Sequence, residues 1–381
     1  MNSVYASLGT TVFETMSRLA AEKGAVNLGQ GFPEDGGPRD ILEAAARATL
    51  DGPNQYPPMR GLPELRQAVA AHYRAHQQID LDWQREVTIT SGATEAIAAA
   101  LLAFIEPGDE VVLFEPMYDA YLPMVLRAGG APRIVRLHPP HWRLERGALA
   151  AAFSERTRVV VINTPHNPCA SVMSADELAL LAELCREHGA IVISDEVWEH
   201  VTFDGVRHVS MLEHLRERTL KIGSAGKMFS LTGWKVGFAC GAPALTDQFA
   251  KAHQFLTFTT PPNLQRAVTY ALGKDASYFD EMRAAFQRSR DRLVSALEGE
   301  GYVLLPAKGA YFVSIDLPAS GIGMSDVAFA QHAIEHGVAT IPLSGFYPNP
   351  DPPNLVRLCF AKRDDTLDRG AAALIKAKRS A

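Results

Sequence analysis

The chain has 381 residues, which is enough to build one or two hydrophobic cores. Hydrophobic residues make up 47% of it and charged residues 21%, as is typical of a globular protein in water. The net charge of −6 and the scattered basic side chains argue against a nucleic-acid partner or an acidic membrane surface.

Cysteine spacing and apolar runs indicate where the protein works. The four cysteines form no CxxC pair and suit neither a zinc site nor a disulfide framework, so we expect no bound metal and a reducing, cytoplasmic setting. The N-terminus has no basic region followed by an apolar run, and the longest uncharged apolar run, residues 96–105, is too short to span a bilayer. We therefore expect neither a signal peptide nor a membrane-spanning helix.

In the first 85 residues, the sequence predicts an N-terminal arm, one short strand and two further helices. Residues 1–20 are expected to form an irregular N-terminal arm with a short helix over 12–20. A short strand then runs from Val26 into a glycine turn. Helices are expected over 39–50 and 63–75, the second of which opens with a proline, as first turns tolerate.

From residue 86 the pattern alternates between short apolar strands and helices. Strands are expected over 87–90, 110–114, 134–137, 159–162, 190–194, 219–223 and 235–240. Ser174 and Glu177 form a capping box that opens one of the intervening helices. Because near-continuous apolar strands separated by helices indicate a sheet covered on both faces, this part is predicted to be α/β with a mostly parallel sheet.

After residue 262 the pattern changes to that of an α+β unit. A long amphipathic helix is expected over 277–299, strands over 302–305, 311–315 and 356–360, and helices over 326–335 and 366–378. We therefore expect three regions: the arm, a large domain of residues 40–280, and a small α+β domain formed by residues 21–39 and 281–381.

Lys227 has an unusual place, at the end of a predicted loop of small residues between two apolar strands. Lysine is rarely buried without a partner, and burial lowers the pKa of its amine. A neutral amine can attack an aldehyde, so Lys227 is a candidate Schiff-base lysine. An exposed lysine in a turn would also fit this local pattern. A phosphate-binding P-loop does not fit, because that motif needs glycine and serine or threonine where the chain has Lys221 and Met228.

Other polar groups are expected beyond the carboxyl ends of the same strands, where open parallel sheets bind their ligands. The residues from Ser91 to Thr94 open a helix whose N-terminus could hold a phosphate, Asp195 follows a strand, and Tyr118 supplies a flat ring. Each of these alone also fits an ordinary turn or core residue. Together, a phosphate cradle, a lysine, a carboxylate and an aromatic ring are what pyridoxal phosphate requires, so the combination favours a site for this cofactor.

Three segments carry a resemblance to a known family: NTPHNP from Asn163, SDEV from Ser194 and SAGKMFSLTGWK from Ser224. With these segments the chain resembles the class I/II aminotransferases of fold type I, in particular the branch that contains kynurenine aminotransferase (glutamine transaminase K) and the bacterial methionine aminotransferases. The resemblance extends from Val26 to Lys362. It implies a seven-stranded sheet between helices, pyridoxal phosphate as cofactor, and a homodimer with active sites at the interface.

The resemblance also implies roles for individual cofactor contacts. Lys227 resembles the Schiff-base lysine and general base, Asp195 the partner of the pyridine nitrogen, and Asn167 the donor to the phenolic oxygen. Tyr118 takes the position of the stacking ring, and Tyr56 that of a tyrosine that reaches the phosphate from the neighbouring subunit. The phosphate contacts fall on Ala93, Thr94, Ser224 and Lys235.

One cofactor position departs from the family pattern. Trp198 stands where the family usually has a tyrosine that donates a hydrogen bond to the phenolic oxygen. An indole N–H is also a donor, but its reach differs. We therefore expect this bond to be weakened or lost, and the Schiff base to have a higher pKa than it would have with tyrosine there.

The implied substrate contacts centre on Arg357, which resembles the clamp on the α-carboxylate. A planar guanidinium binds a carboxylate with two parallel hydrogen bonds, which lysine cannot do. Further substrate contacts are implied for Asn167, Gly31, Phe13, Phe258 and Phe346. The phenylalanines favour methionine, phenylalanine, tyrosine, leucine or glutamine over aspartate or glutamate.

The implied reaction is ping-pong transamination between an amino acid and a 2-oxo acid. Lys227 and Asp195 would serve equally in β-elimination from cysteine conjugates or cystathionine, so that alternative stays open. A cofactor-binding regulator without turnover is disfavoured because there is no basic helix-turn-helix segment. An unrelated nucleotide-binding protein is disfavoured because Gly29 and Gly31 do not continue into GxGxxG.

Overall fold

The computed structural model describes residues 2–6 and 8–381. The two remaining residues belong to the predicted N-terminal arm, and that part of the prediction lies outside the described residues. Within the arm, α1 (Ser3–Ala6) precedes α2 (Val12–Lys23), which is capped by Thr11 and packs on the C-terminal part of the chain. Among the described residues, no helix combines the length and apolar character needed to cross a membrane.

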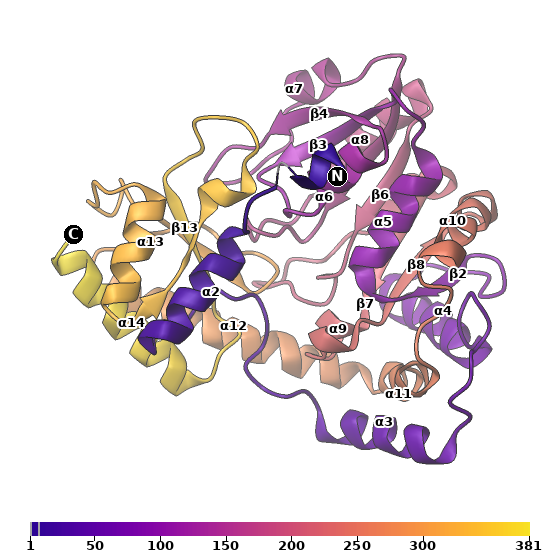
Figure 1. Cartoon of the computed structure of the whole chain (residues 1–381), viewed down its shortest axis with the longest axis horizontal. Helices are drawn as coiled ribbons and strands as arrows, with labels where there is room; N and C mark the ends of the chain where they lie inside the picture. Colours follow the sequence, from indigo (N-terminus) through magenta and orange to yellow (C-terminus); the bar gives the residue numbers. More distant parts are fainter. Residues whose placement is uncertain (1, 7) are drawn as a thin grey trace.

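A seven-stranded sheet lies at the centre of the larger part of the molecule (Figure 1). Its order is β2-β8-β7-β6-β5-β3-β4, and only β8 runs antiparallel to its neighbours. The strands are β2 (Val87–Thr90), β3 (Glu110–Glu115), β4 (Ala131–Arg136), β5 (Thr157–Asn163), β6 (Ile191–Asp195), β7 (Thr219–Ser224) and β8 (Gly237–Gly241). The mostly parallel sheet expected from the apolar runs is therefore confirmed.

Helices surround this sheet, as its buried strands require, since both faces must be covered. The helices of this larger part are α3 (Arg39–Asp51), α4 (Pro63–Gln77), α5 (Gly92–Phe104), α6 (Tyr121–Arg127), α7 (Arg146–Ala151), α8 (Ala175–His188), α9 (Ala225–Met228), α10 (Pro243–Leu256) and α11 (Pro262–Leu272), of which α3 packs on α11. The predicted capping box is present at the start of α8, where the Ser174 hydroxyl and the Glu177 carboxylate each bind the other residue's backbone N–H. Helices α6, α7, α10 and α11 have no counterpart among the predicted elements.

The smaller part of the molecule is built on a four-stranded antiparallel sheet of order β12-β13-β10-β9. A separate parallel pair joins β1 to β11, so the segment after the arm lies with the C-terminal strands. The elements are β1 (Val26–Asn27), β9 (Val303–Leu304), β10 (Phe312–Asp316), α13 (Asp326–Glu335), β11 (Val338–Ala339), β12 (Ile341–Pro342), β13 (Leu355–Cys359) and α14 (Asp364–Arg379). Helix α12 (Ala276–Glu298) runs along both parts (Figure 1). The domain boundaries at residues 39 and 280 stay a prediction.

Three local predictions are wrong in detail. Strand β8 begins at Gly237, two residues after the predicted start. Strand β4 begins at Ala131, three residues before the predicted start. The predicted loop that ends at Lys227 is instead the single helical turn α9, closed by a 3.0 Å hydrogen bond from the Phe229 N–H to the Ala225 carbonyl. One turn of four residues is too short to show helical periodicity in a sequence.

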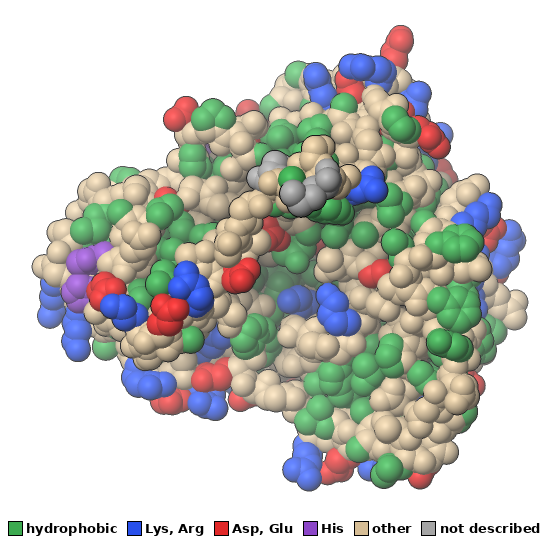
Figure 2. Space-filling view, in the orientation of Figure 1, with side chains coloured by type: hydrophobic (Ala, Val, Ile, Leu, Met, Phe, Trp, Pro, Cys, Tyr) green, Lys and Arg blue, Asp and Glu red, His purple; other side chains and the backbone are tan. Residues whose placement is uncertain are grey.

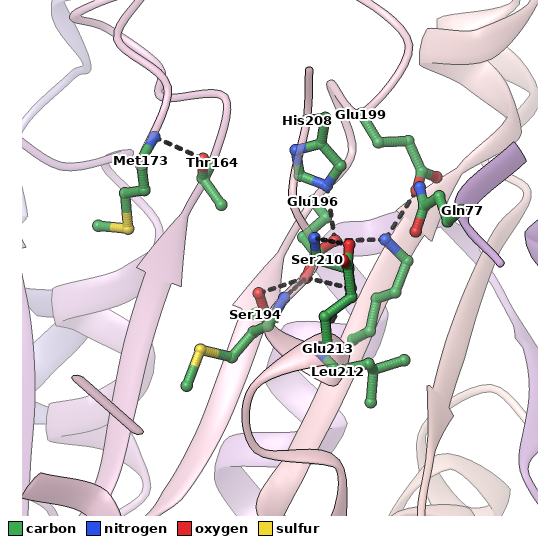
Figure 3. A network of polar contacts seen from close by, with 12 residues as sticks. Gln77, Thr164, Met173, Ser194, Glu196, Glu199, His208, Ser210, Leu212 and Glu213 are labelled. Atoms are coloured by element: carbon green, nitrogen blue, oxygen red, sulfur yellow. Dashed lines mark hydrogen bonds and ion pairs between the residues drawn. The ribbon is translucent and has the colours of Figure 1, made fainter. Parts of the chain in front are cut away.

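A buried polar network joins the middle of β7 to the turn that follows β6 (Figure 3). Lys221 on β7 donates to Glu196, which follows β6, and to Glu199 at 2.7 Å. His208 Nε2 lies 2.7 Å from Glu196, and Gln77 on α4 donates to Glu199 at 2.5 Å. The network therefore ties the turn after β6 to three other segments.

Charge balance explains how this network tolerates burial. Burial alone would lower the pKa of Lys221, but the charges of Glu196 and Glu199 outweigh it and raise that pKa above its ordinary value. Ligand atoms of Glu196, Glu199 and His208 lie within 4.8 Å of one another, as in a metal site. The Lys221 ammonium, bonded to both carboxylates, supplies the positive charge that a metal would supply there.

Replacing Lys221 by methionine is expected to lower the free energy of unfolding by about 3–5 kcal/mol, because it leaves two buried carboxylates without a cation. Urea denaturation at one fixed protein concentration measures this loss. Lys251→Met, which removes an exposed lysine of α10, is the control and should change the free energy little. A loss below about 1 kcal/mol for Lys221→Met would show that the network is not needed for stability.

Candidate active site

The carboxyl ends of β5, β6 and β7 and the start of α5 surround a cavity of about 190 Å³. This is where ligands bind in open parallel sheets. Figure 2 shows that face of the molecule hollowed between its two parts, with basic side chains beside the hollow. The cavity brings together nine of the predicted cofactor residues: Ala93, Thr94, Tyr118, Asn167, Asp195, Trp198, Ser224, Lys227 and Lys235.

One end of the cavity is a cradle for an anion. Helix α5 begins there, so its first N–H groups and its positive dipole end face the space. Lys235 Nζ lies 3.5 Å from Thr94 Oγ1 and adds a positive charge. A Cβ on Gly237 would lie 2.8 Å from Thr90 Oγ1 and 3.0 Å from the Ala93 nitrogen, so only glycine lets β8 pass this close to the helix start.

Lys227 lies at the centre of the cavity wall, on α9. Burial lowers the pKa of its amine to about 8, although the nearby Cys359 and Asp195 act in the opposite direction. Its Nζ lies 4.5 Å from the centre of the Trp198 ring and donates to the Tyr311 hydroxyl at 3.3 Å. The amine is thus held among aromatic rings, and a larger fraction of it is neutral than in an exposed lysine.

Asp195 lies opposite, at the carboxyl end of β6. Burial raises its pKa to about 6, and hydrogen bonds from the Tyr121 hydroxyl and the Val197 N–H limit that rise. The Tyr121 hydroxyl donates to Oδ2 at 2.5 Å. Because burial destabilises the charged form of this carboxylate, a cationic group inside the cavity would stabilise it.

Arg357, on β13, lies beside the cavity and is bonded to one of its lining residues. It is fully buried, and burial lowers its pKa to about 10. Its guanidinium donates to Asn167 Oδ1 at 2.7 Å and to the Gly29 carbonyl at 3.0 Å, while Nε has no partner. Among the described residues no carboxylate lies within ion-pair distance of the guanidinium, although the charge of Asp119 acts on it from farther away.

Aromatic rings enclose this guanidinium. Its central carbon lies 3.9 Å from the centre of the Phe312 ring and 5.0 and 5.3 Å from those of Phe346 and Phe13. A Cβ on Gly31 would come within 2.7 Å of the Phe312 ring, so glycine is required at that crossing. Together with Asn167, four of the predicted substrate residues therefore lie around Arg357: Gly31, Phe13, Asn167 and Phe346.

Two predicted residues lie elsewhere. Tyr56 and Phe258 are 84% and 40% exposed, and neither lines the cavity of its own chain. Their rings form an edge-to-face pair with centres 5.5 Å apart. The structure thus leaves both on the surface.

Sequence reasoning missed two tyrosines that contact the key groups. Tyr121 bonds Asp195, and Tyr311 bonds Lys227 while donating its own proton to the Gly31 carbonyl at 2.8 Å. Neither lies in one of the characteristic segments. Tyr121 comes three residues after the predicted stacking ring, which was the signal available in the sequence.

A larger cavity of about 560 Å³ lies behind the turn that follows β6, with Glu199, Asp204 and Asp291 in its wall. All three carboxylates are already paired, the first with Lys221 and the other two with Arg290. We therefore take the smaller cavity, which contains Lys227 and Asp195, as the candidate active site.

Comparison with known proteins agrees with this geometry. The family model for aminotransferase class I and II matches residues 23–374. Methionine aminotransferase of Escherichia coli K12 is 43% identical over 371 residues, which cover 96% of each protein. Human kynurenine–oxoglutarate transaminase 1 is 35% identical over 92% of each protein.

Solved structures agree as well. The structure of N-succinyldiaminopimelate aminotransferase from Mycobacterium tuberculosis matches with a TM-score of 0.96 and 43% identity, covering 99% of this chain and 100% of that one. These matches confirm the resemblance drawn from the three sequence segments. The chain belongs to the aminotransferase class I and II family.

Proposed function

We propose that the protein is a pyridoxal-phosphate-dependent aminotransferase that moves the amino group of a neutral, apolar or aromatic L-amino acid to a 2-oxo acid. The observation that carries this proposal is the meeting of Lys227 and Asp195 on one cavity. Burial brings the pKa values of these two groups to about 8 and about 6, which suits an amine nucleophile facing a carboxylate.

The cavity residues fit this cofactor. The start of α5, with Thr94, Ser224 and Lys235, would hold the phosphate. Asp195 would hold a proton on the pyridine nitrogen, and Tyr118 would stack on the ring. Asn167 accepts from Arg357 through Oδ1, which leaves its amide N–H groups to donate to the phenolic oxygen.

When bound, pyridoxal phosphate supplies an aldehyde carbon for the lysine amine and a protonated ring that withdraws electrons from the substrate Cα. Lys227 Nζ would hold the cofactor at that carbon, and the free amine would accept the substrate Cα proton as general base. Asp195 would hold a proton on the ring nitrogen through its carboxylate charge. Trp198 supports the lysine from one side, since its ring centre lies 4.5 Å from Nζ.

Arg357 would bind the substrate α-carboxylate. Its buried guanidinium has an unpartnered Nε and no carboxylate partner among the described residues, so an incoming carboxylate would satisfy both its charge and its donor. The Asn167 bond fixes the plane of the guanidinium.

A homodimer would complete the site. Tyr56 and Phe258 are exposed in one chain, and other large apolar side chains exposed in the same way include Leu50 and Phe255, at 84% and 86%. Exposed apolar surface of this kind favours a partner. A second copy would bring its Tyr56 to the phosphate and its Phe258 to the substrate pocket.

The substrate class follows from the rings around Arg357. Phe13 and Phe346 flank the guanidinium, and the cations that line the cavity are Lys227 and Lys235. The second of these lies in the phosphate cradle, so a second substrate carboxylate would meet aromatic carbon. The relatives named for methionine and for kynurenine support this class, while the relative named for N-succinyldiaminopimelate, which is more anionic, is the competing case.

Lys227→Ala is expected to lower the rate of amino-group transfer by more than the ~10²–10⁴-fold typical of a single acid–base group, because it removes nucleophile and base together. Stopped-flow absorbance after mixing loaded protein with methionine, without an oxo acid, measures this step. Lys251→Ala, on the surface, should behave as wild type. Near-normal transfer by Lys227→Ala would rule out this role.

Tyr121→Phe is expected to raise the pKa of Asp195 above about 6, since it removes the hydroxyl that donates to the carboxylate. Because the carboxylate is ionised only above its pKa, the lowest pH at which cofactor is retained should rise too. ¹³C NMR of aspartate-labelled, cofactor-free protein follows the titration. Tyr270→Phe removes a similar bond to exposed Asp40 and should leave Asp195 unchanged. An unchanged or lower pKa in Tyr121→Phe contradicts the assignment.

Methionine is expected to exceed aspartate in kcat/KM by roughly 100-fold or more, because a second carboxylate would lose water against aromatic rings. Initial rates with a common 2-oxo acid measure the ratio. Comparable values for the two substrates, or a clear preference for N-succinyldiaminopimelate, would overturn the proposed class. Pyruvate released from a cysteine conjugate without an oxo acid would reveal β-elimination instead.

A further inference from the structure

We propose that Tyr311 is a positioning residue for the released amine of Lys227, fixing it between the cofactor cavity and the Gly31 segment. The inference rests on the proposed function, because it concerns the interval in which the lysine is free and acts as base. It assigns a role to a residue outside the motifs that mark the site.

The hydrogen-bond directions around Tyr311 carry this inference. The phenol has one proton, and it donates that proton to the Gly31 carbonyl at 2.8 Å. The oxygen that faces Lys227 can then only accept, and Nζ lies 3.3 Å from it. An amine that donates one N–H to Tyr311 has a fixed orientation, with its lone pair pointing away from that hydroxyl.

Packing keeps this hydroxyl in place. Tyr311 is fully buried, and its ring makes edge contacts with Trp198 and Phe312 at centre distances of 4.2 and 5.1 Å. The ring has no room to turn the hydroxyl away from Lys227. The next residue, Phe312, packs on the Arg357 guanidinium, so the base and the carboxylate clamp are positioned by neighbouring residues.

The hydrogen bond between Lys227 and Tyr311 matters more because residue 198 is a tryptophan. In the family pattern a tyrosine stands at 198, whereas here the indole offers Lys227 a ring face 4.5 Å from Nζ. A ring face attracts a cation but does not fix the direction of an N–H bond. Among the hydrogen bonds of the described residues, the acceptor for Lys227 is the Tyr311 hydroxyl.

Removing the hydroxyl has a defined effect on the charge of the amine. A hydroxyl oxygen that accepts from an ammonium stabilises the charged form, so its loss lowers the pKa of the amine. The other groups that act on Lys227 are unchanged in such a variant, and they are the carboxylate of Asp195, the thiol of Cys359, and the cations of Lys235 and Arg357.

The test compares Tyr311→Phe with Tyr302→Phe in the full chain. Tyr302 is also buried and also donates to a backbone carbonyl, that of Leu374 at 2.6 Å, but it lies in the C-terminal part. In cofactor-free protein, the pH dependence of formaldehyde–cyanoborohydride modification at Lys227, quantified by peptide mass spectrometry, gives the pKa of its amine. We expect a fall of about one unit in Tyr311→Phe and no change in Tyr302→Phe.

The loaded enzyme provides a second readout. With Cα-deuterated methionine, Tyr311→Phe should show a larger isotope effect and a roughly 10- to 100-fold lower kcat at an unchanged KM, because proton transfer becomes the slow step.

Other outcomes overturn the inference. An unchanged amine pKa with an unchanged isotope effect in Tyr311→Phe would show that the hydroxyl does not position the lysine. Equal shifts in Tyr311→Phe and Tyr302→Phe would show a general effect of losing a buried hydroxyl. In both cases Lys227→Ala would still abolish transfer, so the proposed function would stand without this residue.

Discussion

Burial of the Lys227 amine is the constraint on which the site depends. The protein encloses this amine with Trp198 and Tyr311 and thereby lowers its pKa to about 8, so that a useful fraction is neutral near physiological pH. Burial acts on Asp195 in the opposite sense and raises its pKa to about 6. Removal from water thus lowers the pKa of the Lys227 amine and raises the pKa of the Asp195 carboxyl. The first shift favours a neutral, nucleophilic amine, and the second favours pairing with a cation.

The fold supplies this burial through the order of its strands. Residues 163 and 195 are paired neighbours on β5 and β6, and residue 195 pairs with Ile222 on β7, so polar groups that are distant in sequence share one edge of the sheet. The Lys221 network fixes the turn after β6, which also carries Trp198. Arg357 reaches the same place from the smaller part of the molecule and keeps an unsatisfied donor. The two parts therefore bring an amine, a carboxylate and a guanidinium to one region of the molecule.

Much of this could be predicted from the sequence, because short characteristic segments follow the strands. Most residues of the cavity wall lie in three such segments, Asn163–Pro168, Ser194–Val197 and Ser224–Lys235. The helical turn at Lys227 was missed because four residues carry no periodicity. Tyr311 was missed because its contacts with Lys227 and Gly31 span 84 and 280 residues, and only the folded chain shows which hydroxyl meets which amine.

The most direct test of this account is to identify the residue that carries the cofactor. Protein loaded with pyridoxal phosphate is reduced with borohydride, digested, and the modified peptide is sequenced by mass spectrometry. The account predicts a single phosphopyridoxyl group on Lys227, because its amine combines a lowered pKa with a place on the cavity wall. Modification of Lys235 or Lys221 instead, or no stable modification, would contradict it.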